Sequence, residues 1–295
     1  MCLPFMVLFC IIILNTNTMK TLLIPVDFTD ASENVLKYAA DFTCDAHIER
    51  IVVLKSFHVS VYAELYPSAD FVQLTNEDIA GERQKVVTDL KALAKELLKK
   101  CNPLTKVETL ISELPLVRAI HEAIEREHPY MIMVGSDNEL ADSYRSERLI
   151  AIAKISTVPV MIIPNHTHYK KIERALVPCD VAAISRLSAL KAFSDPTKFL
   201  HPHLLVLNVD PSKKHSVTKN QLTAGLVEPL KDYEYKVYHS EENDVVSGII
   251  DFADKQHVQL IIALPGKYSF FYNLTHKSIT KALALNSHRA VLILK

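Results

Sequence analysis

Two aspartates stand at matching places in the sequence and are candidates for binding a ligand. Asp27 ends the segment Leu-Ile-Pro-Val-Asp, and Asp180 ends the segment Leu-Val-Pro-Cys-Asp. A carboxylate at the end of a buried strand can accept hydrogen bonds from the hydroxyl or amine groups of a ligand. The same carboxylate can instead accept backbone N–H bonds at the start of the next helix. The position alone leaves both roles open.

The other reactive side chains form no complete catalytic or metal-binding motif. His166-x-His168 and His201-x-His203 have the spacing of two metal ligands on an extended segment, but no third ligand stands near either pair. We interpret them as solvent-exposed loop histidines. The five cysteines contain no C-x-x-C pair, which is typical of reduced thiols in a cytosolic protein. The absence of a G-x-S-x-G sequence argues against a serine hydrolase.

Glycine is scarce in this chain. Only five glycines occur among 295 residues, where average usage of roughly 7% would give about twenty. No two of them lie close together, so the sequence has neither a G-x-G-x-x-G turn nor a G-x-x-x-x-G-K-[ST] phosphate loop. Both motifs need neighbouring glycines to bring the backbone close to a pyrophosphate. A nucleotide site in this chain must be built in another way.

Strands and helices are predicted to alternate along the chain. Predicted strands cover residues 20–26, 51–54, 107–111, 131–134 and 160–163. The first helix is predicted to begin at Asp30, because Asp30-Ala-Ser-Glu33 has the spacing of a capping box. Further helices are predicted over residues 77–100, 116–127 and 146–156. This alternation predicts an α/β protein with a parallel sheet that is covered by helices on both faces.

The second half of the chain repeats the order of the first. Besides the two aspartate segments, residues 128–134 match residues 257–263, and residues 158–163 match residues 289–294. Three matches in the same order predict a duplicated domain, with the first copy at 19–165 and the second at 171–295. A chance likeness between two generic α/β domains is the alternative.

An apolar run at the N-terminus invites comparison with a membrane segment. Residues 3–14 are continuously apolar, but twelve helical residues span only about 18 Å of a hydrocarbon core of about 30 Å. The run also lacks the preceding basic residues and the cleavage site of a signal peptide. We expect residues 1–18 to be an extension that is not part of the mature protein, without stable membrane insertion. A short anchor or signal is the alternative.

Charge excludes some partners. The chain has 33 basic and 34 acidic side chains and a net charge of −1 at pH 7. This balance gives no reason to expect a nucleic acid or an anionic membrane as a partner.

The order of these features resembles the universal stress protein family. The likeness rests on residues 24–30, 134–136 and 157–163, and it covers nearly all of 19–295 as two tandem copies. It implies two Rossmann-like doubly wound five-stranded parallel sheets with strand order 3-2-1-4-5, similar to adenine nucleotide alpha hydrolases. Their ligands would lie in a crevice at the carboxyl ends of strands one and four. Because the last strand mediates dimers in this family, the two copies are expected to pair as an internal pseudo-dimer, with a homodimer also open.

Family members that bind ATP carry the pattern Gly-x2-Gly-x9-Gly-Ser/Thr after strand four, at a helix N-terminus. The first copy matches it only at Gly135, which Ser136 follows. Asn138 replaces the second glycine, the loop is two residues short, and Ser146-Glu147 stand at its end. The second copy keeps the spacing and ends in a serine, but it has none of the three glycines. The residues at its last three positions are Lys267, Lys277 and Ser278.

Charge also separates the two loops. Residues 135–147 carry four acidic side chains and one basic one, whereas residues 264–278 carry two lysines and no acid. The first loop therefore has the more suitable backbone for phosphate and the second has the more suitable charge. The resemblance implies ATP or another adenine nucleotide, with Mg²⁺, as the ligand, and the changed loops imply that its binding is weak, degenerate or lost.

These observations predict a cytoplasmic, non-catalytic tandem universal stress protein that acts in the stress response by binding a ligand or a partner. The candidate nucleotide-binding residues are Pro25, Asp27, Gly135, Ser136, Ser146, Asp180, Lys267, Lys277 and Ser278. One alternative is an ATP-using enzyme of the same superfold, performing adenylation or slow ATP hydrolysis, because a fold does not decide function. Another is a scaffold whose pockets are filled by its own side chains, with aromatic residues of 268–272 in the second copy.

Overall fold

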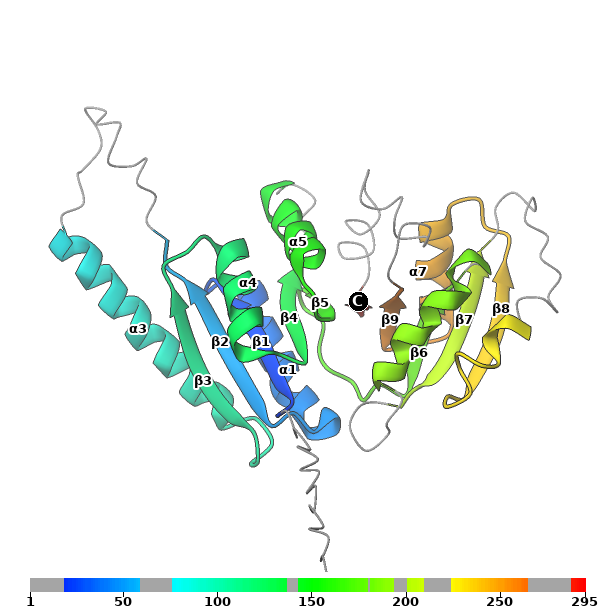
Figure 1. The fold of residues 1–295 in the computed structure, drawn as a ribbon, viewed down its shortest axis with the longest axis horizontal. Helices are drawn as coiled ribbons and strands as arrows, with labels where there is room; N and C mark the ends of the chain where they lie inside the picture. The colour runs from blue at the N-terminus through cyan, green and yellow to red at the C-terminus, as the bar shows by residue number, and fades with distance from the viewer. Residues whose placement is uncertain are drawn as a thin grey trace, which may run out of the picture.

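The computed structural model describes residues 19–58, 76–136, 143–179, 181–193, 201–209, 224–264 and 288–295. The predicted extension at 1–18 lies outside them. The described strands form one sheet in the order β3-β2-β1-β4-β5-β10-β9-β6-β7-β8 (Figure 1). The strands are β1 Thr21–Val26, β2 Arg50–Ser56, β3 Lys106–Ser112, β4 Met131–Ser136, β5 Val160–Pro164, β6 Arg174–Pro178, β7 His203–Val209, β8 Tyr235–Ser240, β9 Leu260–Ala263 and β10 Ala290–Ile293. The helices are α1 Asp30–Ala46, α3 Asn76–Leu98, α4 Leu116–Glu127, α5 Ser143–Ile155, the 3-10 helix η1 Val181–Phe193, and α7 Val245–Lys255.

The sheet consists of two parallel halves that meet in an antiparallel pair. The first half, β1–β5, has the order 3-2-1-4-5, and the second half, β6–β10, has the same order counted from its own first strand. At the junction, Val291, Leu292 and Ile293 of β10 lie opposite Ile162, Met161 and Val160 of β5. The predicted fold class and the predicted pairing of the two terminal strands are therefore confirmed.

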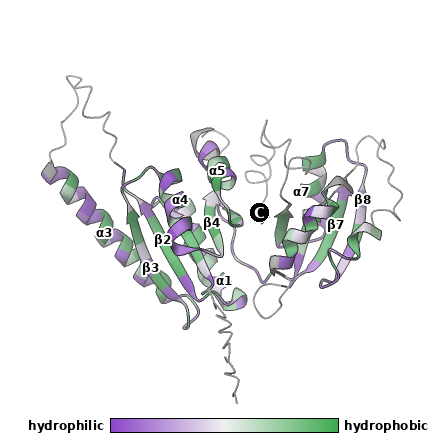
Figure 2. Ribbon diagram, in the orientation of Figure 1, coloured by the Kyte–Doolittle hydropathy of each residue, from purple (hydrophilic) through white to green (hydrophobic). Residues whose placement is uncertain are grey.

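Helices cover both faces of the first half, as the alternation predicts. On one face, α1 and α3 pack against the strands through Val35, Phe42, Leu90 and other buried apolar residues. On the opposite face, α4 and α5 pack through a separate cluster that includes Ile120 and Ile152. Figure 2 shows the same arrangement, with hydrophobic strands between helices that have one hydrophobic and one hydrophilic side. Among the described residues, no helix is both long and apolar enough to cross a membrane.

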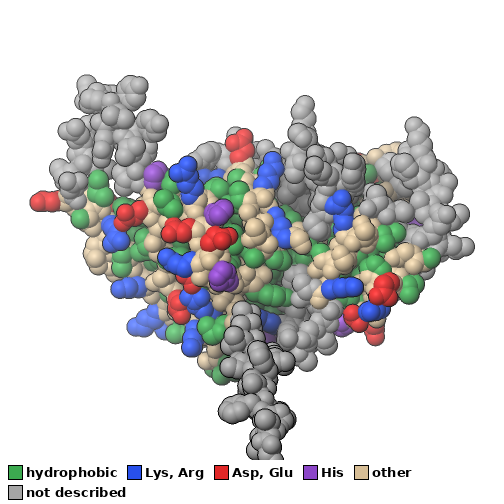
Figure 3. Space-filling model, in the orientation of Figure 1, with side chains coloured by type: hydrophobic (Ala, Val, Ile, Leu, Met, Phe, Trp, Pro, Cys, Tyr) green, Lys and Arg blue, Asp and Glu red, His purple; other side chains and the backbone are tan. Residues whose placement is uncertain are grey.

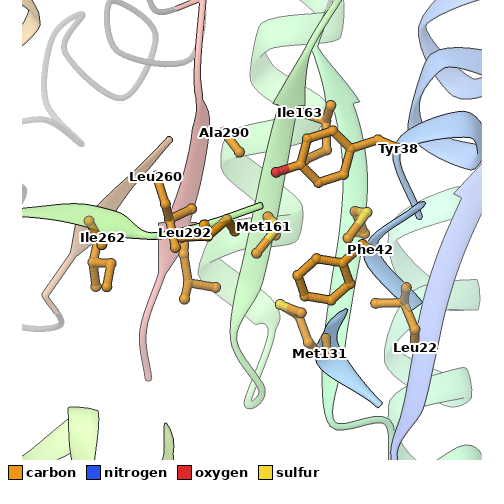
Figure 4. Close-up of a cluster of buried hydrophobic side chains, with 14 of the residues drawn as sticks. Leu22, Tyr38, Phe42, Met131, Met161, Ile163, Leu260, Ile262, Ala290 and Leu292 are labelled. Atoms are coloured by element: carbon orange, nitrogen blue, oxygen red, sulfur yellow. The ribbon is translucent and has the colours of Figure 1, made fainter. Parts of the chain in front are cut away.

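The core on the α1 face continues across the junction into the second half. Figure 4 shows Tyr38 and Phe42 of α1 beside Met161 of β5, followed by Leu292 of β10 and Leu260 of β9. All five side chains belong to one cluster of buried residues. The two halves therefore share a hydrophobic core as well as a sheet.

Acidic, basic and hydrophobic side chains are interspersed on the face of the molecule seen in Figure 3. This distribution agrees with the balanced charge of the sequence.

The start of α1 differs from the capping box that the sequence predicts. The helix begins at Asp30, its N-cap is Thr29, and the Thr29 side chain makes no capping bond. Instead, the N–H and the hydroxyl of Thr29 both donate to Oδ1 of Asp27, at 3.1 and 2.5 Å. The prediction of Asp30 as the cap is wrong, because Asp30 is already the first helical residue, and the Asp27 carboxylate holds the N-cap residue Thr29 in place.

Histidine occupies positions where glycine is the usual residue. His47 and His128 are the C-caps of α1 and α4, and both have left-handed backbone conformations, with φ of 49° and 44°. His257, two residues after α7, has φ of 51°. Glycine is common at such helix ends because it has no Cβ to clash. Glycine is therefore missing from helix ends as well as from the phosphate loops.

Candidate functional site

A pocket of about 650 Å³ lies at the carboxyl ends of β1, β2 and β4 in the first half. Its walls come from the β1–α1 turn, the end of β2, the start of α4, the end of β4 and the middle of α5. Because β1 and β4 are neighbours whose following helices cover opposite faces, this is the topological switch point of the half-sheet. Open parallel sheets bind their ligands at this place.

Asp27 lines the pocket and is exposed in it. Burial of the carboxyl group opposes its ionisation, but hydrogen bonds from the side chain and N–H of Thr29 and from Ser32, with the attraction of Lys55, outweigh that effect. The pKa of Asp27 is therefore lowered. Both Thr29 bonds end on Oδ1, and a carboxylate has further acceptor positions for a ligand. Asp27 thus fixes the turn that precedes α1 and remains on the pocket wall.

Lys55 lies on the same wall, at the end of β2. It pairs with Val26 in the sheet register, directly beside Asp27. Its Nζ lies 4.3 Å from the centre of the Phe28 ring, a cation–π contact. Burial lowers the pKa of Lys55, and the charge of Asp27 offsets part of that effect. Phe28 itself has φ of 66°, an unusual backbone conformation for an aromatic residue.

The end of β2 is fixed to the turn before α4 by three hydrogen bonds. The Ser56 hydroxyl donates to the carbonyl of Leu114 at 2.7 Å, and the Phe57 N–H donates to the carbonyl of Ser112 at 2.8 Å. The ring Nδ1 of His58 lies 3.0 Å from the carbonyl oxygen of Glu113. Ser56 and His58 therefore belong to one connected wall of the pocket together with the first residues of α4.

Gly135 lies at the end of β4, where α1 approaches it closely. A Cβ at this position would lie 2.7 Å from the carbonyl oxygen of Ala31. Close packing of α1 on β4 therefore requires glycine here whether or not a phosphate binds. Ser136, the next residue, is fully buried, and its carbonyl accepts the N–H of Asn165 at 2.7 Å.

This packing makes Gly135→Ala a sensitive substitution. The added methyl group meets backbone, which cannot move aside like a flexible side chain, so we expect a loss of about 1–3 kcal/mol in the free energy of unfolding. Urea denaturation followed by circular dichroism measures it. The matched control is Gly81→Ala in the second turn of α3, where a Cβ has no atom within 4 Å. That variant should gain about 0.5–1 kcal/mol through helix propensity, and equal effects at both sites would contradict the packing argument.

The structure brings together only some of the predicted site residues. Pro25, Asp27 and Gly135 line the pocket, and Ser136 is buried next to it. Ser146 is part of α5, but its side chain is outside the described residues. The candidates of the second half, which are Asp180, Lys267, Lys277 and Ser278, also lie outside the described residues.

Sequence reasoning missed several polar residues of the pocket, among them Lys55, Ser56, His58 and Arg148. The first three could have been found, because they follow the predicted strand at 51–54, which the expected sheet order places beside strand one. Arg148 was harder to place, because it lies within a predicted helix.

The histidine pairs do not form a metal site. His166 and His168 are exposed in the link between the halves, as expected. The His201 ring instead stacks on Tyr233, with 4.8 Å between ring centres. Among the described residues, no group of three or more histidine, cysteine, aspartate or glutamate side chains could hold a metal ion.

The sheet order defines a doubly wound α/β protein with a pocket at its switch point, and solved structures share this fold. A universal stress protein from Archaeoglobus fulgidus superposes with a TM-score of 0.67 at 18% identity, covering 93% of this chain and 96% of that one. The cytoplasmic domain of a prokaryotic cation chloride cotransporter superposes with a TM-score of 0.51 at 13% identity, covering 93% and 94%. The resemblance to universal stress proteins is thus confirmed for the fold of both halves.

A third structure matches only half of the chain. It is a universal stress protein family protein from Arabidopsis thaliana with AMP bound, which covers 50% of this chain and 92% of its own, at 16% identity and a TM-score of 0.34. A likeness of this extent assigns no ligand to the present chain. No protein-family model matches the sequence, and no curated protein matches it either.

Proposed function

We propose that this chain is a cytoplasmic tandem universal stress protein, with copies at 19–165 and 171–295, that acts by binding a ligand without transforming it. The proposed ligand is an adenine nucleotide, bound weakly in the pocket of the first half. The observation that carries the proposal is the position of this pocket, at the carboxyl ends of β1 and β4 with Asp27 on its wall. The fold shared with a universal stress protein supports it.

The chemistry of the pocket suits a nucleoside. A volume of about 650 Å³ falls within the usual range of small-molecule sites. Val26, Leu116, Val134 and Ile152 offer apolar surface for a base. Asp27 offers carboxylate oxygens for ribose hydroxyls or the adenine amine, which are hydrogen-bond donors.

The charges of the pocket favour binding over catalysis. A general base works best when its pKa lies near the working pH. The pKa of Asp27 is lowered instead, which makes this carboxylate a weak base. Asp27 and Glu147 are the two carboxylates among the lining residues that the structure describes, and they could coordinate a Mg²⁺ ion that is bound to the nucleotide.

Titration calorimetry of the full chain with adenosine, AMP and ATP, with and without Mg²⁺, tests the proposal. The wild type should bind at least one of them, and Asp27→Asn should bind it roughly 10-fold more weakly, because a hydrogen bond to a charged group contributes about 1.5–3 kcal/mol. Asparagine keeps an oxygen for the Thr29 N–H, so the fold should persist. Asp244→Asn is the matched control, because Asp244 caps α7 in the second half by accepting the N–H of Val246 at 3.0 Å.

The control variant should bind like the wild type. A wild type that binds no nucleotide would refute the proposal and leave the scaffold alternative. Phosphate release that disappears in Asp27→Asn would instead establish the ATP-using enzyme.

A further inference from the structure

Exposed hydrophobic residues gather at the end of the first half where its strands begin, opposite the pocket. Within the part of the chain that the structure describes, five large hydrophobic side chains are exposed, and three of them lie at this end: Met19, Leu98 and Leu104. Their exposed fractions are 45%, 48% and 85%. Single exposed hydrophobic residues are ordinary on a protein surface, but a contiguous group of them marks an interaction site.

The sheet register places these residues at one edge of the molecule. Thr21 of β1 pairs with Arg50 of β2, and Arg50 pairs with Lys106 of β3. The starts of β1 and β3 are therefore two strand spacings, or about 10 Å, apart. Met19 lies two residues before the first of these strands, and Leu104 lies two residues before the third. The last turn of α3 lies at the same end of the half-sheet (Figure 1).

Lysines surround the exposed hydrophobic residues. Residues 95–106 contain four lysines, all exposed, and one acidic residue, Glu96, whose carboxylate pairs with Lys99. Lys95, Leu98 and Lys99 lie on one side of the end of α3, because residues three and four apart are neighbours on a helix. The dipole of α3 favours lysines at its C-terminus, but it does not account for exposed leucines beside them.

Together these side chains form the amino-end patch, which consists of Met19, Lys95, Leu98, Lys99, Lys100, Leu104 and Lys106. We propose that the amino-end patch binds the surface of a membrane that contains anionic lipids. The lysines attract the lipid phosphates, and the hydrophobic side chains enter the boundary between headgroups and acyl chains. The balanced charge of the whole chain does not oppose this binding, because salt screens charges that are more than about 10 Å away.

The apolar run at residues 3–14 precedes this edge in the sequence. Five residue steps separate Leu14 from Met19, so a chain that retains the run has its end within about 18 Å of the patch. The run is too short to cross a bilayer, but it can add apolar contact at the membrane surface. One weak attachment gives marginal binding, whereas an apolar segment combined with a basic patch gives stable binding.

Sedimentation of the full chain with lipid vesicles tests the proposal. The wild type should bind vesicles of phosphatidylcholine with phosphatidylglycerol roughly 10-fold more tightly than vesicles of phosphatidylcholine alone. The triple variant Lys99→Gln, Lys100→Gln, Lys106→Gln should bind the anionic vesicles roughly 100-fold more weakly, since each lysine near such a surface contributes about 1 kcal/mol. Leu104→Ser should weaken binding to both kinds of vesicle roughly 10-fold, through lost apolar contact.

The matched control is the triple variant Lys37→Gln, Lys85→Gln, Arg118→Gln, which removes the same charge from exposed positions on α1, α3 and α4. Lys85 precedes Lys99 by about 21 Å along the helix axis. The control should bind both kinds of vesicle like the wild type, and an equal loss in both triple variants would overturn the proposal.

Two further results would also overturn it. The first is equal binding of the wild type to neutral and anionic vesicles, which would leave the apolar run as the attachment. The second is no binding to vesicles, whether or not the protein binds polyglutamate as a model of an acidic peptide. None of these results bears on nucleotide binding, so the proposed function is tested separately.

Discussion

Replacing Leu292 by lysine is expected to unfold the protein across both halves. Leu292 is 1% exposed on β10, faces Met161 of β5 in the antiparallel pair, and belongs to the core cluster that crosses the junction. A charge without a partner in that cluster costs several kcal/mol, which is comparable with a total stability of about 5–15 kcal/mol. Far-UV circular dichroism and urea denaturation of the purified chain measure the loss.

The extent of that unfolding is the informative part. Because the halves share a core and a sheet, Leu292→Ala, which should cost about 2–5 kcal/mol, is expected to keep a single cooperative transition. Leu104→Lys is the control for the new charge, because Leu104 is 85% exposed, and it should change stability by less than about 0.5 kcal/mol. Two separate transitions in Leu292→Ala, with the first half unaffected, would show that the halves fold independently.

The elements of the first half could be predicted because burial leaves a periodic pattern in the sequence. The helix expected over 116–127 is α4 with the same bounds, and the one expected over 77–100 is α3 at Asn76–Leu98. Strands such as 131–134 are apolar throughout because helices cover both faces of the sheet. The duplicated order was readable for the same reason, and it led to the correct pairing of the two terminal strands.

Features set by contacts distant in sequence could not be predicted in this way. Nothing in the sequence shows that the backbone of Ala31 lies against Gly135. The predicted role of Gly135 therefore rested on the phosphate-loop pattern alone. The N-cap of α1 is Thr29, and the spacing Asp30-x-x-Glu33 does not reveal that the Asp27 carboxylate binds it. The left-handed conformations of His47 and His128 are likewise invisible, because propensity favours glycine there.

In the candidate site, too, one residue could be predicted from a sequence pattern and another could not. Asp27 was found because a polar residue at the end of a buried strand stands out. Lys55 was not singled out, since a lysine after a strand is common, and its contact with Phe28 and its attraction to Asp27 become apparent only in the folded chain.

Replacing Arg50 by glutamine should cost about 2–4 kcal/mol at pH 7. Arg50 begins β2 and binds Glu108 of β3 at 2.6 Å and Glu127 of α4 at 2.7 Å. The side chains of Arg50 and Glu127 are only 17% and 14% exposed, so the substitution leaves a largely buried carboxylate with one fewer partner. Lys99→Gln is the control, because its pair with Glu96 is well exposed on both sides, and it should change stability by less than about 0.5 kcal/mol.

The pH dependence of this cost identifies its origin. A hydrogen bond from Arg126 and the bonds and charge of Arg50 lower the pKa of Glu127, against the opposing effect of burial. A lowered folded-state pKa stabilises the protein above the unfolded value of about 4.3, and this stabilisation is lost as the pH falls through the folded value. The difference between wild type and Arg50→Gln should therefore be largest near pH 7 and shrink below about pH 4 in urea titrations. A difference that stays constant down to pH 3 would show that Arg50 acts through packing of its side chain and not through its charge.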